Sequence, residues 1–131
     1  MPVFRNRNII SGNTTAGVYI TGAAATGNTV LGDYIGLDPN GTTAIGNGTG
    51  IILNAPGNTI GALGGGIFRT IISGNTSTGL TVTGGGVVQN QMINTWINLK
   101  SDATALSGAS KAIVVNNPGR LKLSGDNKVR G

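Results

Sequence analysis

The sequence contains no cysteine, no histidine and no glutamate, and only 10% of its 131 residues are charged. Without cysteine, the chain forms no disulfide and supplies no thiolate nucleophile. The only carboxylate side chains are Asp33, Asp38, Asp102 and Asp126. General acid–base catalysis therefore has few candidate groups, and we predict neither an enzyme nor a cofactor or metal site.

Long apolar runs are also missing. No run is long enough to cross a bilayer, and residues 1–7 lack the apolar core of a signal peptide. We therefore expect no membrane span and no export signal in this chain.

Glycine is abundant, with 24 residues, and asparagine and threonine are also frequent. Such a composition is compatible with a disordered linker. Against this, Ile, Val and Leu recur in tight clusters separated by Gly and Asn, which is typical of short strands joined by turns. No window has a sustained helical period, so we predict an all-β chain.

The net charge of +5 is unevenly distributed. Residues 1–99 hold three cations and two anions, whereas residues 100–131 hold six cations and two anions, giving +1 and +4. The six cations are Lys100, Lys111, Arg120, Lys122, Lys128 and Arg130. They predict either a patch that binds an anionic polymer or a solvated end that resists aggregation. No pattern indicates a specific nucleic-acid partner.

Internal repetition is the strongest feature of the sequence. Residues 8–14 (NIISGNT) return as residues 70–76 (TIISGNT), 62 positions later, and residues 17–22 (GVYITG) return as 79–84 (GLTVTG). A shorter period is visible where residues 28–30 (NTV) return as 58–60 (NTI). We interpret the repeat as a coil of roughly 30 residues with three short strands, stacked about four times into a parallel solenoid.

This register predicts three columns of inward aliphatic residues. The first contains Val30, Ile60, Val88 and Leu121, and the second contains Ile10, Ile35, Ile72 and Ile93. The third contains Val18/Ile20, Ile51/Leu53, Leu80/Val82 and Ile113/Val115. Residues 37–49, 62–68 and 95–110 are predicted to be loop insertions, with Gly and Asn supplying the positive φ that turns need.

The strings GVYITG, GNTVLGDYIGLDPNGTTAIGNG and APGNTIG resemble the right-handed parallel β-helix repeats of large bacterial surface or secreted proteins. Those repeats belong to the pectin-lyase-like superfamily. The resemblance covers residues 7–86 and decays from residue 87, where Trp96, Lys100 and Lys111 replace small or polar residues. It implies one domain over 1–131 with degenerate last coils, an extracellular or surface location, and a chain that starts within a coil, as a fragment or cassette does.

Polysaccharide lyases and hydrolases are the enzymes that the resemblance suggests, but no two aspartates fall in one column of adjacent coils. A hydrolase needs two carboxylates about 5–10 Å apart. Asp38-Pro39-Asn40-Gly41 resembles part of a calcium loop but lacks further oxygen ligands, and we interpret it as a turn.

Two outward rows are candidate interfaces. One runs along the third strands and the other beside the second-strand column: Tyr19, Ile52, Thr81 and Val114, then Ile9, Tyr34, Ile71 and Met92. The second set either faces outward or fills a corner. Either stripe marks a partner surface, or the long loops fold over it. No capping helix is present at either end, so stacking through open strand edges is a further hypothesis.

Three functions remain open at this point. The first is a non-catalytic structural module that self-associates through coil ends or a side stripe. The second is a carbohydrate-binding module that uses Tyr19, Tyr34 or Trp96 with the basic residues to hold an anionic polysaccharide. The third is a remnant of a polysaccharide-active enzyme.

Overall fold

The computed structural model describes residues 7–63, 69–83, 88–106, 111–116 and 118–131. Within these ranges all thirteen regular elements are β-strands, and the strands pair in parallel. Nowhere in these ranges is there a helix with the length and apolar character needed to cross a bilayer. The all-β prediction is confirmed.

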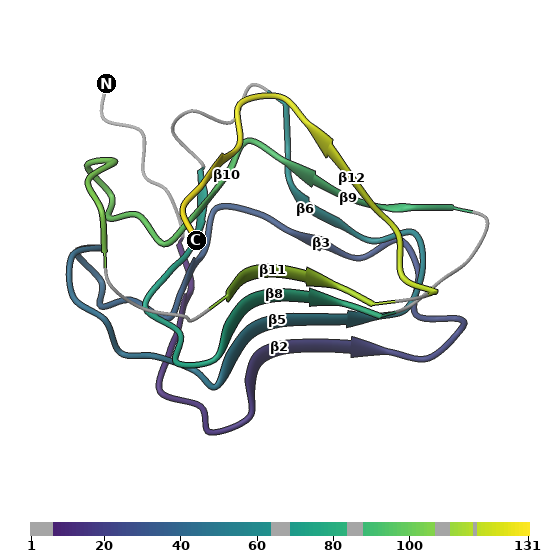
Figure 1. The fold of residues 1–131 in the computed structure, drawn as a ribbon, viewed down its shortest axis with the longest axis horizontal. Helices are drawn as coiled ribbons and strands as arrows, with labels where there is room; N and C mark the ends of the chain where they lie inside the picture. Colours follow the sequence, from purple (N-terminus) through teal and green to yellow (C-terminus); the bar gives the residue numbers. More distant parts are fainter. Residues whose placement is uncertain (1–6, 64–68, 84–87, 107–110, 117) are drawn as a thin grey trace.

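The strands form three parallel sheets that run along the molecule (Figure 1). The first contains β1 (Ile9–Ile10), β4 (Tyr34–Ile35), β7 (Thr70–Ile72), β10 (Thr95–Ile97) and β13 (Lys128–Val129). The second contains β2 (Ala16–Thr21), β5 (Thr49–Asn54), β8 (Thr78–Val82) and β11 (Lys111–Val115). The third contains β3 (Thr29–Val30), β6 (Thr59–Gly61), β9 (Asn90–Ile93) and β12 (Leu121–Ser124).

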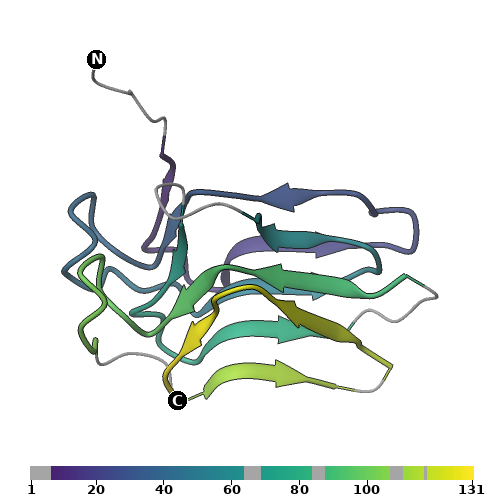
Figure 2. The ribbon, with the colours of Figure 1, turned by 90° about the horizontal axis from the view of Figure 1, so that it is seen from above.

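Successive strands belong to successive sheets, so the chain winds as a parallel β-solenoid. Figure 2 shows the coils stacked in sequence order, from purple at one end to yellow at the other. The stacks of four strands correspond to about three turns, which differs slightly from the predicted four coils. Each coil pairs its backbone with the next and extends one narrow core.

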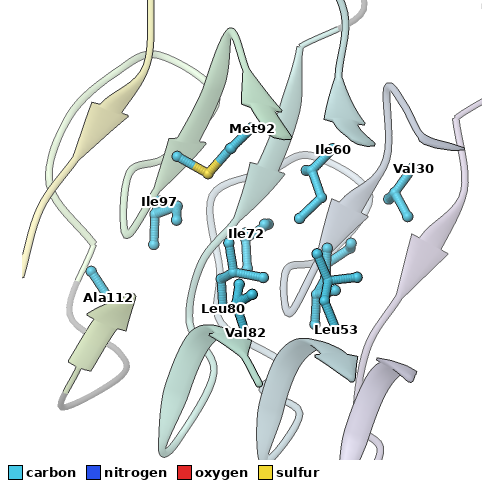
Figure 3. Close-up of a cluster of buried hydrophobic side chains, with 11 residues drawn as sticks. Val30, Leu53, Ile60, Ile72, Leu80, Val82, Met92, Ile97 and Ala112 are labelled. Atoms are coloured by element: carbon cyan, nitrogen blue, oxygen red, sulfur yellow. The ribbon is translucent and has the colours of Figure 1, made fainter. Parts of the chain in front are cut away.

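The third predicted column is confirmed. In the second sheet Val18 pairs with Ile51 and Ile20 with Leu53, and the same register continues through β8 and β11. The central members of the column are fully buried: Ile51, Leu53, Leu80 and Val82. Figure 3 shows side chains from all three sheets meeting in one cluster.

The first predicted column is wrong at Val88. Ile60 pairs with Met92, not with Val88, and Met92 pairs with Leu123, although Leu121 of the same strand packs against the core as predicted. Val88 is 63% exposed outside any strand, whereas Met92 lies in the core with no exposed surface. Placing Met92 in the outward row was therefore also wrong.

The second predicted column is wrong after Ile72. Ile72 pairs with Ile97, which pairs with Val129, whereas Ile93 lies in a different sheet. β10 lies inside the segment that we predicted as an insertion from residue 95, so that insertion begins only after Ile97. The repeat spacing changes in these coils, and a fixed period therefore misplaces both columns.

Asparagine ladders, not turns, explain much of the asparagine content. Asn13 donates its backbone and side-chain N–H groups to Oδ1 of Asn47, at 3.0 Å each, and Asn47 does the same to Asn75. Asn28 and Asn58 form a second ladder, again through Oδ1. The described non-glycine residues with positive φ are Asn94, Asn98 and Ala103. The asparagines thus satisfy buried backbone groups between coils.

A third ladder lies at the corner before the five-stranded sheet. Asn8 donates two hydrogen bonds to Oδ1 of Asp33, and Thr95 donates its N–H to Oδ1 of Asn127 at 2.8 Å. Each corner of the solenoid therefore carries its own row of side-chain hydrogen bonds. These rows fix the register of one coil on the next.

The insertion after β4 is confirmed as a tight turn at Asp38-Pro39-Asn40-Gly41. The N–H of Gly41 donates to the carbonyl of Asp38 at 3.0 Å, and Gly41 has a φ of 72°. A β-bridge joins Leu37 to Ala44 and closes the loop. In the insertion predicted at 62–68, residues 64–68 lie outside the described ranges.

Candidate self-association surfaces

The outer face of the second sheet carries the predicted side stripe. The strand register aligns four residues in one row: Tyr19, Ile52, Thr81 and Val114. Tyr19 is 56% exposed, and the other three residues are partly exposed. The row is therefore accessible and mainly apolar. None of its four residues belongs to the hydrophobic cluster that Leu37 and Leu106 form on the five-stranded sheet.

The outer face of the five-stranded sheet is different. Its row contains Ile9, Tyr34, Ile71, Trp96 and Lys128. Tyr34 and Ile71 point away from the main core and yet are only 9% and 2% exposed. They form a second hydrophobic cluster with Leu37 and Leu106, which lie in the two long loops. On this face the loops cover Tyr34 and Ile71, as the alternative interpretation proposed, whereas Ile9 at the edge of the sheet stays 37% exposed.

The cover consists of two loops from different coils that bind each other. The N–H of Ser101 donates to the carbonyl of Gly41 at 2.8 Å, and its hydroxyl donates to the carbonyl of Asn40 at 3.0 Å. A β-bridge joins Leu99 to Ala105 and closes the second loop in the same way as the first. The loops thus make a lateral layer on the five-stranded sheet, at one side of Figure 1.

Arginine side chains complete this cover by lying over the aromatic rings. The guanidinium carbon of Arg7 is 3.9 Å from the ring centre of Tyr34, and that of Arg69 is 4.4 Å from the ring of Trp96. Arg69 also donates to the carbonyls of Asn94 and Asp126, both at 3.2 Å. Because these carbonyls belong to later coils, Arg69 ties three consecutive coils together.

Two of the three aromatic residues expected to bind a glycan are therefore engaged inside the protein. Tyr34 is buried under Arg7, and Trp96 packs against Arg69, with the ammonium of Lys128 5.3 Å from its ring centre. Tyr19 alone among the three presents its ring openly to solvent. The indole N–H of Trp96 is buried without a hydrogen-bond partner.

The six C-terminal cations do not gather on one face. Lys111 begins β11, Lys122 lies in β12 and Lys128 lies in β13, so that each belongs to a different sheet. Arg120 precedes β12 and Arg130 follows β13, while Lys100 lies in a covering loop. The cations are therefore distributed over all three sheets and one covering loop.

The four aspartates all make structural contacts. Asp33 accepts hydrogen bonds from Asn8, and Asp126 lies 4.0 Å from a guanidinium nitrogen. In Asp38, hydrogen bonds from the backbone amides of the threonines four and five positions on lower the pKa. In Asp102, hydrogen bonds from the hydroxyl and the amide of the threonine two positions on lower the pKa. Among the described residues, no three acidic, histidine or cysteine side chains converge on a common metal position.

The last coil exposes the continuation of the core. Val115, Leu123 and Val129 are 45%, 54% and 45% exposed. They continue the inward columns of residues that have no exposed surface one coil earlier: Val82, Met92 and Ile97. At the other end Ile10, Val18 and Ile20 are also only partly buried. Aliphatic side chains are thus half covered at both ends of the stack.

An open groove of about 370 Å³ lies where the second sheet turns toward the third, next to the Tyr19 row. The side chains of Thr21, Asn54 and Thr83 line it and form a hydrogen-bonded row. Asn54 donates to the Thr21 hydroxyl at 3.1 Å and accepts from the Thr83 hydroxyl at 3.0 Å. The groove offers neutral polar groups and no charged side chain.

Comparison with known proteins gives no relative. No protein family matches the chain, and neither the curated proteins nor the solved structures contain a significant match.

The sequence contained a signal for the ladders that the column assignment did not use. Asn28, Asn58 and Asn90 each stand two positions before an inward aliphatic residue of the third sheet. Following this Asn-x-aliphatic spacing selects Met92 as the successor of Ile60 and corrects the first column. An asparagine repeated at coil spacing therefore indicates a ladder and fixes the register.

Proposed function

We propose that the chain is a non-catalytic structural module, a rigid β-solenoid that associates with copies of itself through its coil ends. The observation that carries this proposal is the half exposure of Val115, Leu123 and Val129, whose column neighbours are fully buried. Covering these side chains with another coil removes apolar surface from water and pairs the open strand edges. The Tyr19 row offers a second, lateral surface for the same purpose.

The engagement of all four aspartates in ladders, turns and an ion pair supports a non-catalytic role. Each carboxylate is committed to holding backbone or side-chain groups in place. A remnant polysaccharide-active enzyme is the least supported of the three functions.

The positive net charge of the chain affects the assembly reaction. Copies of the chain repel each other at low ionic strength because every copy carries a net charge of +5. Added salt screens this repulsion and leaves apolar contacts intact. We therefore expect association to increase with salt, which is opposite to the behaviour of binding to an anionic polymer.

The test is molecular mass across a concentration series, with electron microscopy of the same samples. Leu123→Lys places a charge on the open end, and Tyr19→Lys places the same charge on the stripe. Both positions are more than half exposed, so both variants keep the fold. End association predicts loss of oligomers in Leu123→Lys alone. A wild-type monomer at every concentration and salt would refute the proposal.

A carbohydrate-binding function is the second candidate, and the groove beside Tyr19 favours it. Its hydroxyl and amide groups and the neighbouring open ring suit a neutral glycan more than an anionic one. Retention on a polysaccharide column that survives high salt and is lost in Tyr19→Ala supports this function. Retention lost at high salt instead indicates the cations.

From the resemblance of its repeats, we further propose that the chain belongs with the pectin-lyase-like β-helix repeats of large bacterial surface or secreted proteins. The parallel solenoid and its asparagine ladders are compatible with that assignment. An extracellular or surface location follows from it. Surface labelling of cells that produce the protein tests the location.

A further inference from the structure

The two ends of the solenoid are not simply complementary, because the first sheet has one strand more than the other two. Within the chain each group of three strands stacks on the preceding group, with β4, β5 and β6 on β1, β2 and β3. A second copy that continues this pattern places its β1, β2 and β3 on β10, β11 and β12. The edge of β10 is already occupied by β13.

We propose that β13 is an internal stand-in for β1 of a second copy, and that the two segments compete for the edge of β10. This inference rests on the proposed function, association through coil ends, and adds the element that controls it. The interaction surface is the edge of Thr95–Ile97, and its partner is the segment Asn8–Ile10 of another copy.

The two segments match position by position. Asn127, Lys128 and Val129 pair with Thr95, Trp96 and Ile97. In the first coil the same three places are held by Asn8, Ile9 and Ile10. Both segments thus begin with a ladder asparagine and end with an inward aliphatic residue.

Mainly polar contacts hold the segment in place. Arg69 donates to the carbonyl of Asp126, and the side-chain amide of Asn98 donates to the carbonyl of Arg130 at 2.8 Å. Oδ1 of Asn127 accepts from the N–H of Thr95 at 2.8 Å, and its side-chain amide donates to the carbonyls of Met92 and Ser124. The N–H of Arg130 donates to the carbonyl of Ile97 at 3.1 Å. Both residues of β13 are exposed, so little apolar burial opposes its release.

The incoming segment is the more apolar of the two. Exchange replaces Lys128 with Ile9 on the outer side, next to the Trp96 ring, and replaces Val129 with Ile10 on the core side. The ladder bond to Thr95 is remade with an asparagine from the second copy. Exchange also allows β11 and β12 to pair with β2 and β3 of the second copy. While β13 occupies the edge of β10, it keeps the first coil of that copy from reaching these strands.

A reversible disulfide tests the competition. Ile97 and Val129 are register partners on adjacent strands. Their Cα atoms are therefore about 4.8 Å apart, which is within the range of Cα–Cα distances that a disulfide spans. The chain has no cysteine of its own to mispair. In the double variant Ile97→Cys/Val129→Cys, the oxidised form keeps β13 on β10, and the reduced form releases it.

We expect light scattering and electron microscopy to show oligomers for the reduced double variant and monomer for the oxidised form at equal concentration. Oligomers of equal size and amount in both forms would overturn the competition while leaving end association intact. Monomer in both forms and in the wild type would overturn the proposed function as well. The two failures are therefore distinguishable.

A second variant loosens the segment without a covalent bond. Asn127→Ala removes the acceptor for Thr95 and two side-chain donors, so the onset concentration for assembly falls about tenfold as more molecules expose β10. Asn116→Ala is the matched control, because it makes the same uncharged change at an exposed position after β11 and removes none of these bonds. An onset equal to that of the control contradicts the inference.

Discussion

Asn47 makes the most consequential polar contacts in the solenoid, and its replacement by alanine is the most direct test of the ladders. The side chain has no exposed surface. Its Oδ1 accepts two hydrogen bonds from Asn13, and its Nδ2 donates to the carbonyl of Ile10 and to Oδ1 of Asn75 at 2.9 and 3.1 Å. One side chain therefore links three coils.

The expected cost follows from those four bonds. A hydrogen bond inside a protein contributes about 1 kcal/mol net, and an orphaned buried group costs more. The backbone and side-chain N–H groups of Asn13 bind water once their acceptor on Asn47 is removed, which reduces the loss of stability. We therefore expect Asn47→Ala to lower the free energy of unfolding by about 2–4 kcal/mol.

Asn13→Ala is the control, because Asn13 is exposed and stands at the end of the same ladder. It removes the side-chain bond to Asn47 and a long, exposed one to the carbonyl of Ser11, so we expect a loss below about 1 kcal/mol. Urea unfolding followed by the fluorescence of the single tryptophan, Trp96, measures both. Equal losses in the two variants would show that the ladder does not stabilise the core.

Three further predictions concern other contacts. Gly61→Ala should destabilise the fold by more than about 2 kcal/mol, because the new Cβ meets a backbone carbonyl and the φ of Gly61 is +82°. Gly22→Ala is the control, because its Cβ meets open space and only the backbone strain at φ +111° remains; thermal unfolding of the two variants measures the difference. Arg69→Met should shift the Trp96 emission to longer wavelength and lower stability by about 1–3 kcal/mol, and an unchanged spectrum would contradict the stacking. Because the pKa of Asp38 is lowered in the fold, its contribution to stability is present above the ordinary aspartate pKa and is lost as the pH falls through the lowered pKa. The NMR shifts of the amides that bind Asp38 should change with pH around the lowered pKa in the wild type and not in Asp38→Asn.

The sequence alone determined the class of fold and the register of its regular half. The 62-residue repeat and the clustered aliphatic residues indicated stacked coils of short strands, and the column through Ile51 and Leu80 is where the repeat predicts it. Such a prediction works because each coil makes the same contacts with its neighbour, so the chemistry of a column is visible in the sequence as a period.

The fixed period failed where the coils change length. Met92 and Ile97 replaced the residues chosen by spacing, because backbone pairing and the asparagine ladder, not residue count, decide which side chain enters the core. Loops of different length between strands leave this pairing intact while shifting every number after them. Ladder asparagines carry the information that the period loses.

Only the tertiary structure decided which surfaces are covered. Tyr34 and Tyr19 both occupy outward strand positions, yet Tyr34 is buried under a loop and Arg7 while Tyr19 is open. The sequence cannot distinguish them, because the cover comes from segments distant along the chain. The place of β13 is a similar case: two exposed residues matter because of the strand edge on which they lie, and that edge exists only once the coils have stacked.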